Sequence, residues 1–257
     1  MPANDLALLI DAARKAAETA LAYVGGPLDV RNKPADDTPV TAADLAVNAV
    51  LHDMLRDARP DYGWLSEESE ADPGRHTARR TFVVDPIDGT RAFIEGQRAW
   101  AHALAVVEDG AVIAAVVHLP VMDKLYAAAR GGGARLNGKP ISVGRVDAPA
   151  RADVLATRPS MEAHHWPGGV PPVTRSYRPS LAYRLSLVAE GRFDAMFTFR
   201  PTWEWDIAAG SLLLSEAGAR VTDRRGGRLS FNAAHPQADG VLAANPDLHA
   251  ALLDRLI

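Results

Sequence analysis

The chain has 257 residues, of which 47% are hydrophobic and 23% charged, with a formal net charge of −4 at pH 7 and no cysteine. This length and balance indicate a globular protein of one or two domains that buries a core without disulfides, and the missing cysteines also exclude thiolate metal sites and thiol nucleophiles. The acidic net charge and the lack of any long basic block argue against a nucleic-acid polymer as partner.

The first part of the chain is predicted to contribute two helices. Apolar residues spaced three and four apart predict a helix over residues 4–24 and a second one from Ala42 to about Ala58, with Thr41 as its N-cap. The first segment has acids where a signal peptide needs bases, and no apolar run is long enough to cross a bilayer. We therefore expect a cytoplasmic protein without a membrane partner.

Strand patterns follow these helices. The predicted strands of the first half are Tyr62–Leu65, Thr81–Val84, a pair around an Asp109-Gly110 turn, Leu125–Ala129 and a pair around Asn137-Gly138. They indicate a largely antiparallel sheet. From about residue 150, predicted strands at 153–157, 193–199 and 239–244 alternate with predicted helices at 180–190, 207–217 and 246–256. We expect two halves, residues 1–150 and 151–257, packed as one unit.

The segment FVVDPIDGT, which ends at Thr90, concentrates negative charge behind an apolar strand. Pro86 lacks an N–H and restricts the residue before it, so the strand is expected to end there with Asp85 and Asp88 on one turn. Carboxylates without neighbouring histidine or cysteine favour a hard cation such as Mg²⁺ or Mn²⁺. Gly89 permits close approach of the backbone, and a helix from Thr90 would direct free N–H groups at an anion. The pattern suits a phosphate ester, and a turn in which Asp88 caps the helix is the structural alternative.

Other segments also place acids at the ends of predicted elements. Glu67 and Glu68 follow a short strand, and adjacent strand residues point to opposite faces, so at most one of them is expected at a site. Asp206 lies at the start of an apolar helix, where an N-cap is the structural alternative. Asp44 lies three residues after Thr41, where a capping box is the alternative.

The segments WLSEE, VDPIDGT and WDIAAG, with Lys33 and Asp44 upstream, together resemble the inositol monophosphatase family of magnesium-dependent, lithium-sensitive phosphatases. The resemblance covers nearly the whole chain. It implies an α+β or α/β fold, a layered αβαβα sandwich of the inositol monophosphatase and fructose-1,6-bisphosphatase type, with the metals at the junction of the two halves. It also implies two or three Mg²⁺ ions per site and, by family precedent, a homodimer.

By position, the resemblance assigns metal ligands to the acids described above. Glu67, Asp85 and the backbone carbonyl of Ile87 would hold the first Mg²⁺. Asp85, Asp88 and Asp206 would hold the second, and a third, weaker ion would share Glu67.

The resemblance also implies hydrolysis of a small phosphate monoester by a metal-activated water, which needs no covalent nucleophile. Thr90, Asp44 and Glu67 are the predicted catalytic residues, with Thr90 touching the water and Asp44 accepting a hydrogen bond from Thr90. Asp88 and the amides of Gly89 and Thr90 are the predicted phosphate contacts. If Thr90 and Asp44 serve only as helix caps, their loss should reduce stability and not turnover.

Residues at and just after the end of the predicted strand 193–199 bear on the substrate. Inositol monophosphatases have a glutamate that binds sugar hydroxyls where this chain has Phe199, next to Arg200, and a shift of one or two residues would bring Glu204 to that role. The segment RPTWEWD resembles more closely the bacterial 3'(2'),5'-bisphosphate nucleotidases. Phe199, Trp203 and Arg200 suit an aromatic base and a second phosphate, although Phe199 and Trp203 are also ordinary core residues.

These residues predict hydrolysis of 3'-phosphoadenosine 5'-phosphate to AMP and phosphate, with inositol-1-monophosphatase and then histidinol-phosphatase as alternatives. Outside the enzymes, the alternative is a sensor of a phosphate ligand with the same fold. Such a sensor is expected to have lost metal ligands, and here all the predicted acids are present. Arg178 and Arg184 flank the predicted helix at 180–190. One interpretation places them at the mouth of the site, and the other on the surface, where arginines are common.

Overall fold

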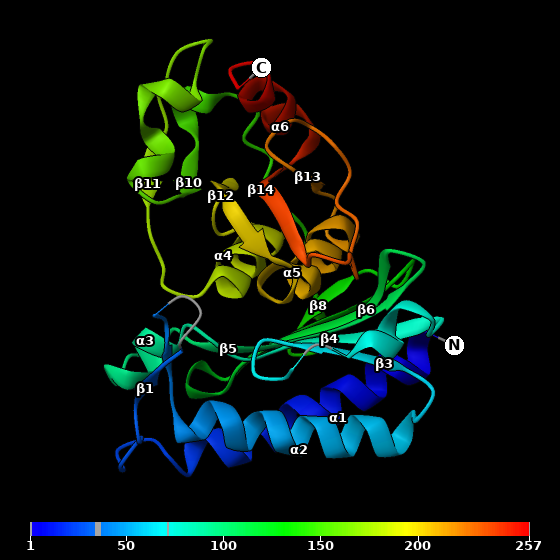
Figure 1. The fold of residues 1–257 in the computed structure, drawn as a ribbon. Helices are drawn as coiled ribbons and strands as arrows, with labels where there is room; N and C mark the ends of the chain where they lie inside the picture. The colour runs from blue at the N-terminus through cyan, green and yellow to red at the C-terminus, as the bar shows by residue number, and fades with distance from the viewer. Residues whose placement is uncertain (1, 34–36, 71, 257) are drawn as a thin grey trace.

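The computed structural model describes residues 2–33, 37–70 and 72–256, in which layers of helices alternate with layers of sheet (Figure 1). The helices are α1 (Pro2–Leu21), α2 (Ala42–Ala58), α3 (Thr90–Ile94), α4 (Leu181–Ala189), α5 (Glu204–Glu216) and α6 (Pro246–Leu253). A small two-stranded sheet pairs β1 (Arg31–Asn32) with β2 (Pro39–Val40). Among the described residues, no helix is long and apolar enough to cross a membrane.

The larger sheets use different parts of the chain. In spatial order, the seven-stranded sheet contains β3 (Gly63–Ser66), β4 (Arg80–Asp88), β5 (Ala101–Glu108), β6 (Ala111–Leu119), β7 (Lys124–Ala129), β8 (Ala134–Leu136) and β9 (Lys139–Pro140). It is antiparallel except for the β3–β4 pair. The five-stranded sheet contains β11 (Thr174–Ser176), β10 (Asp153–Leu155), β12 (Ala195–Trp203), β14 (Gln237–Ala244) and β13 (Arg220–Thr222). The division into halves near residue 150 stays a prediction.

Hydrophobic cores separate the layers. One lies between α1, α2 and the seven-stranded sheet and includes Leu9, Val47 and Phe82. The middle core joins the two sheets through α4 and α5, and the last one packs α6 on the outer face of the five-stranded sheet around Phe197 and Leu248. This order of layers confirms the predicted αβαβα sandwich.

Local sequence signals explain several boundaries. The second predicted helix is confirmed over its full length, with Thr41 as N-cap. The predicted hairpin turn is confirmed as well, because Asp109 and Gly110 both have positive φ (51° and 74°), the conformation that a tight two-residue hairpin requires. The first helix ends at Leu21, three residues before the predicted end.

The strand β4 differs from its prediction. It continues through Pro86 to Asp88 and does not end at the proline. Asp85 and Asp88 pair with the residues on either side of His102 in β5, so Pro86 and Ile87 together face this single residue. Two residues opposite one form a β-bulge, where a proline is tolerated because its missing N–H is not required by the ladder. Because Ala101 and Ala103 lie on the same face of β5, the bulge brings their partners Asp85 and Asp88 to one face of the sheet.

Candidate active site

Asp85 is the predicted acid on which the charges of the other predicted acids act most widely. The residue is 1% exposed, and its pKa is raised well above the ordinary value by burial and then by the charges of Glu67, Asp88, Asp206 and Asp44. Its Oδ1 atom has no hydrogen-bond partner among the described residues. A buried carboxylate in this position is costly unless a cation or a proton compensates its charge.

Asp88 is held by the N-terminus of α4. Its Oδ2 atom accepts hydrogen bonds from Ser180 Oγ and from the Ala182 amide, both at 2.6 Å. Burial raises the pKa of Asp88 to about 6, although these two bonds and the positive charge of Arg184 act in the opposite direction. Asp88 therefore does not cap α3, whose N-cap is Gly89 at φ 97°, a left-handed conformation that favours glycine.

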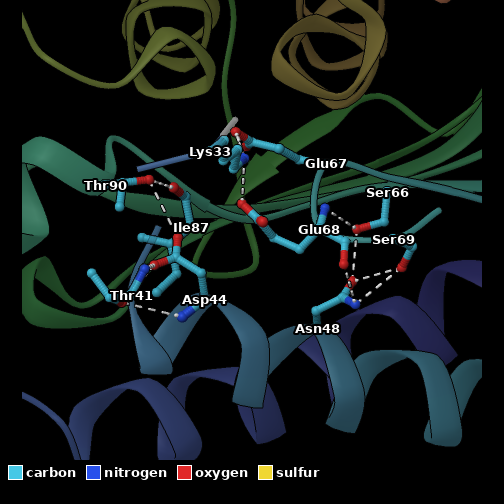
Figure 2. A network of polar contacts seen from close by, with 10 residues as sticks. All are labelled: Lys33, Thr41, Asp44, Asn48, Ser66, Glu67, Glu68, Ser69, Ile87 and Thr90. Carbon is cyan, nitrogen blue, oxygen red and sulfur yellow. Dashed lines mark hydrogen bonds and ion pairs between the residues drawn. The ribbon is translucent and has the colours of Figure 1, made fainter. Parts of the chain in front are cut away.

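The turn after β3 places Glu67 and Glu68 against the ammonium group of Lys33 (Figure 2). Lys33 Nζ lies 2.7 Å from Glu67 Oε1 and 2.7 Å from Glu68 Oε1. The expectation that only one of these acids can reach a given site was wrong, because β3 ends at Ser66 and the alternation of a strand does not extend to them. Burial, followed by the charge of Glu67, raises the pKa of Glu68 to about 7, and Lys33 opposes this shift.

Asn48 of α2 anchors the same turn. Its Oδ1 accepts a hydrogen bond from Ser66 Oγ at 2.7 Å, and its Nδ2 donates to the Glu68 carbonyl at 3.2 Å and to Ser69 Oγ at 3.0 Å (Figure 2). The turn that carries Glu67 is thus fixed to the helix that carries Asp44.

Asp44 uses its two carboxylate oxygens for different partners. Oδ2 accepts from the Thr41 amide at 2.9 Å, which completes a capping box, and also from Thr41 Oγ1 at 2.5 Å. Oδ1 lies 3.3 Å from Thr90 Oγ1, which is also 3.2 Å from the Ile87 carbonyl (Figure 2). Burial raises the pKa of Asp44, and the bonds from Thr41 oppose that shift. The helix-capping contact and the Thr90 contact therefore coexist.

Asp206 is the third residue of α5, whose N-cap is Trp203, so it is not the N-cap of that helix. Burial, and then the charges of Asp88 and Glu67, raises its pKa well above the ordinary value. Arg200 Nη2 lies 3.8 Å from Asp206 Oδ2, and the Arg200 side chain is 61% exposed. An exposed cation thus lies at the edge of the acidic cluster.

Phe199 is not placed to contact a substrate, so this prediction was wrong. The residue is 4% exposed in the core beneath α6, where its ring stacks on Phe197 at 5.4 Å and also contacts Trp166. The cause is the two-residue period of β12, which puts Phe199 on the same face as Phe197.

Glu204 is likewise wrongly predicted as a substrate contact. It is 1% exposed, and its carboxylate accepts hydrogen bonds from the amides of Asn232 at 2.5 Å and Ala233 at 3.0 Å. Both oxygens are therefore used to hold a loop of the protein itself.

Two site features were missed from the sequence. Ser180 and the Ala182 amide bind Asp88, although a serine directly before an apolar helix is a recognisable N-cap signal. The surface interpretation of Arg184 was wrong: it is 6% exposed, donates to the carbonyls of Arg178 and Pro179, and acts electrostatically on Asp88.

The donor set fits a hard divalent cation, because it contains carboxylate and carbonyl oxygens, one of them without a partner. Over residues 2–33, 37–70 and 72–256, no three acidic or histidine side chains are gathered closely enough to hold a metal ion. In this arrangement Lys33 supplies positive charge to Glu67.

Comparison with known proteins gives the family. The sequence profile described as the inositol monophosphatase family matches residues 2–256. The chain belongs to the inositol monophosphatase family. It is 39% identical over 198 residues to an inositol-1-monophosphatase of Rhizobium meliloti, covering 73% of each chain. It is 35% identical over 238 residues to the 3'(2'),5'-bisphosphate nucleotidase CysQ of Escherichia coli, covering 85% of this chain and 90% of the relative.

The fold comparison agrees with this family. The crystal structure of extragenic suppressor protein suhB from Bartonella henselae superposes with a TM-score of 0.85 at 28% identity, covering 98% of both chains. As a member of the inositol monophosphatase family, the chain is a phosphatase that acts on phosphoric monoesters, and the family is generally dependent on Mg²⁺. The relatives carry different substrate names.

Proposed function

We propose that the chain hydrolyses 3'-phosphoadenosine 5'-phosphate to AMP and phosphate in a Mg²⁺-dependent reaction. The observation that carries this choice is Arg200, an exposed cation 3.8 Å from Asp206 at the edge of the acidic cluster. A guanidinium group binds a second phosphate well. Glu204, the alternative for binding the hydroxyls of a sugar ring, is buried and bound to the amides of Asn232 and Ala233.

The proposed metal ligands include acids whose negative charges raise the pKa values of their neighbours. Glu67, Asp85 and the Ile87 carbonyl would hold one Mg²⁺, and Asp85, Asp88 and Asp206 a second, with a third ion sharing Glu67. The unpartnered Oδ1 of Asp85 and the raised pKa values of three of these acids support the assignment. When bound, the cations would neutralise the phosphate charge and lower the pKa of the attacking water.

The protein's own residues would position and deprotonate that water. The Thr90 hydroxyl lies 3.3 Å from Asp44 Oδ1, and if it donates its proton there, its lone pairs are free to accept a proton from the water. Burial raises the pKa of Asp44, which makes this carboxylate a better proton acceptor. The amides of Gly89 and Thr90, at the start of α3, would hold the phosphate oxygens.

Inositol 1-phosphate is the second candidate substrate, because the relative from Rhizobium meliloti is an inositol-1-monophosphatase. Histidinol phosphate is the third.

The test compares kcat/KM for 3'-phosphoadenosine 5'-phosphate, 3'-AMP, inositol 1-phosphate and histidinol phosphate. The first two differ only by the 5'-phosphate, so Arg200→Ala should lower kcat/KM for the bisphosphate by about 10- to 100-fold and leave 3'-AMP nearly unchanged. Arg151→Ala is the matched control, since Arg151 also forms an exposed ion pair with an aspartate, 2.5 Å from Asp147, next to α6. A preference of about tenfold or more for inositol 1-phosphate would refute the proposed substrate.

A further inference from the structure

A buried histidine faces the bulge that carries the acids. His102 is 0% exposed, and its Nδ1 lies 2.5 Å from the carbonyl oxygen of Pro86. Because a carbonyl oxygen can only accept, Nδ1 carries the proton and donates it. Its other ring nitrogen, Nε2, has no partner among the described residues. Among the described residues, the ring therefore makes a single hydrogen bond, which it donates from Nδ1.

The bulge explains why this hydrogen bond is needed. Opposite His102, the strand β4 contributes Pro86 and Ile87 where a regular ladder would have one residue. A bulge disrupts the ladder locally, and a buried carbonyl without a donor is unfavourable. The imidazole supplies that donor from the neighbouring strand.

The surroundings hold the ring in one orientation. Trp100 packs against it edge to face, with ring centroids 5.5 Å apart, and the His118 ring lies 6.2 Å away. His118 in turn lies with Nδ1 3.1 Å from the Ala13 carbonyl of α1. Burial lowers the pKa of His102 to about 3, so the ring is neutral at physiological pH.

Holding the Pro86 carbonyl also fixes the residues on each side of it. The peptide unit between Pro86 and Ile87 is planar, so the direction of the Pro86 carbonyl sets the orientation of the Ile87 amide and Cα. Asp85 precedes this unit, and the Ile87 carbonyl follows it, 3.2 Å from Thr90 Oγ1. Both are oxygen donors of the same proposed cation.

We propose that His102 is a positioning residue for the metal-binding turn: by donating to Pro86, it fixes the bulge that directs the Asp85 carboxylate and the Ile87 carbonyl at one cation. This inference rests on the proposed metal-dependent function. It gives His102 no contact with the substrate or the reacting atoms.

The test uses two variants of similar size. His102→Leu removes the donor, and His102→Asn retains an N–H close to the position of Nδ1. Calorimetric titration with Mn²⁺ should show about 10- to 100-fold weaker binding to the leucine variant, the usual effect of losing a group that orients a metal ligand, and near-normal binding to the asparagine variant. The Mg²⁺ concentration for half-maximal activity should rise in parallel, while KM for the ester at saturating Mg²⁺ stays unchanged.

Two other outcomes distinguish failure of the proposal for His102 from failure of the proposed metal-dependent function. If the wild type binds Mn²⁺ and both variants bind it equally, with only their melting temperatures lowered, His102 is a packing residue and the proposal is wrong. If the wild type binds no Mn²⁺, the proposed function itself fails.

A measurement on the wild type serves if the leucine variant does not fold. Nitrogen-15 NMR of the histidine rings should show His102 as a neutral ring protonated at Nδ1. A ring protonated at Nε2 and not at Nδ1 would overturn the proposal.

Discussion

Removing the Thr90 hydroxyl separates the catalytic role of Asp44 from its helix-capping role. Thr90→Ala deletes an atom that lies 3.3 Å from Asp44 Oδ1 and 3.2 Å from the Ile87 carbonyl, while the Thr90 amide remains for the phosphate. Loss of an acid–base contribution lowers kcat by roughly 10²- to 10⁴-fold, equivalent to about 2.7–5.4 kcal/mol of activation free energy. KM should change little, because the predicted phosphate contacts persist.

Thr41→Ala is the matched control on the other carboxylate oxygen. It removes the hydroxyl that donates to Asp44 Oδ2 at 2.5 Å and caps α2, but the Thr41 amide still donates to the same oxygen at 2.9 Å. Loss of such a cap costs about 1 kcal/mol of unfolding free energy. The control should therefore melt at lower temperature with nearly normal turnover. Asp44→Asn should lower both stability and kcat.

The assay is steady-state phosphate release at saturating Mg²⁺, together with urea unfolding of each variant. The double variant of Thr90 and Asp44 should have a kcat close to that of the slower single variant, because either loss disables the same relay. Normal turnover in Thr90→Ala, or effects on kcat that simply multiply, would refute the relay.

The remaining predictions concern buried residues. Phe199→Leu should lower the unfolding free energy by about 1–2 kcal/mol, because Phe199 packs in the core, and Glu204→Gln by about 1–3 kcal/mol, because it weakens the bonds to the 232–233 amides. Neither variant should change KM. An increased KM in either variant would indicate that the residue contacts the substrate. The pKa of His102 is about 3 in the folded protein, below its ordinary 6.5. Its contribution to the free energy of unfolding is therefore complete above pH 6.5 and is lost as the pH falls. At pH 5 the free energy of unfolding is lower by about 2 kcal/mol for this reason. Urea unfolding at pH 7 and pH 5 should show this decrease in the wild type and not in His102→Asn. An equal pH dependence of the unfolding free energy in the wild type and in His102→Asn would contradict this prediction.

Local signals made much of the fold predictable. The capping pattern of Thr41 and Asp44 fixed the start of α2, and the Asp-Gly pair fixed the hairpin between β5 and β6, because each depends on residues close together in the chain. The acids of the DPIDGT segment were recognisable for the same reason.

The contacts that complete the site are long-range and had no local signal. Asp88 is bound by Ser180, 92 residues later, and Glu204 is bound by amides about 28 residues later. The prediction for Phe199 failed because position relative to a family motif does not state which face of β12 a side chain occupies. Pro86 was read as the end of a strand because the bulge that accommodates it is defined by pairing with β5.

The central claim is that Asp85 and the surrounding acids bind divalent cations that hydrolysis requires. The direct measurement is phosphate release from 3'-phosphoadenosine 5'-phosphate by the purified protein, in excess chelator and after Mg²⁺ is restored, for the wild type and Asp85→Asn. We predict no release in chelator, full recovery with Mg²⁺, and the near-complete loss of activity in the variant, because Asp85 would serve two cations. Undiminished release in excess chelator, or wild-type turnover by Asp85→Asn, would contradict the claim.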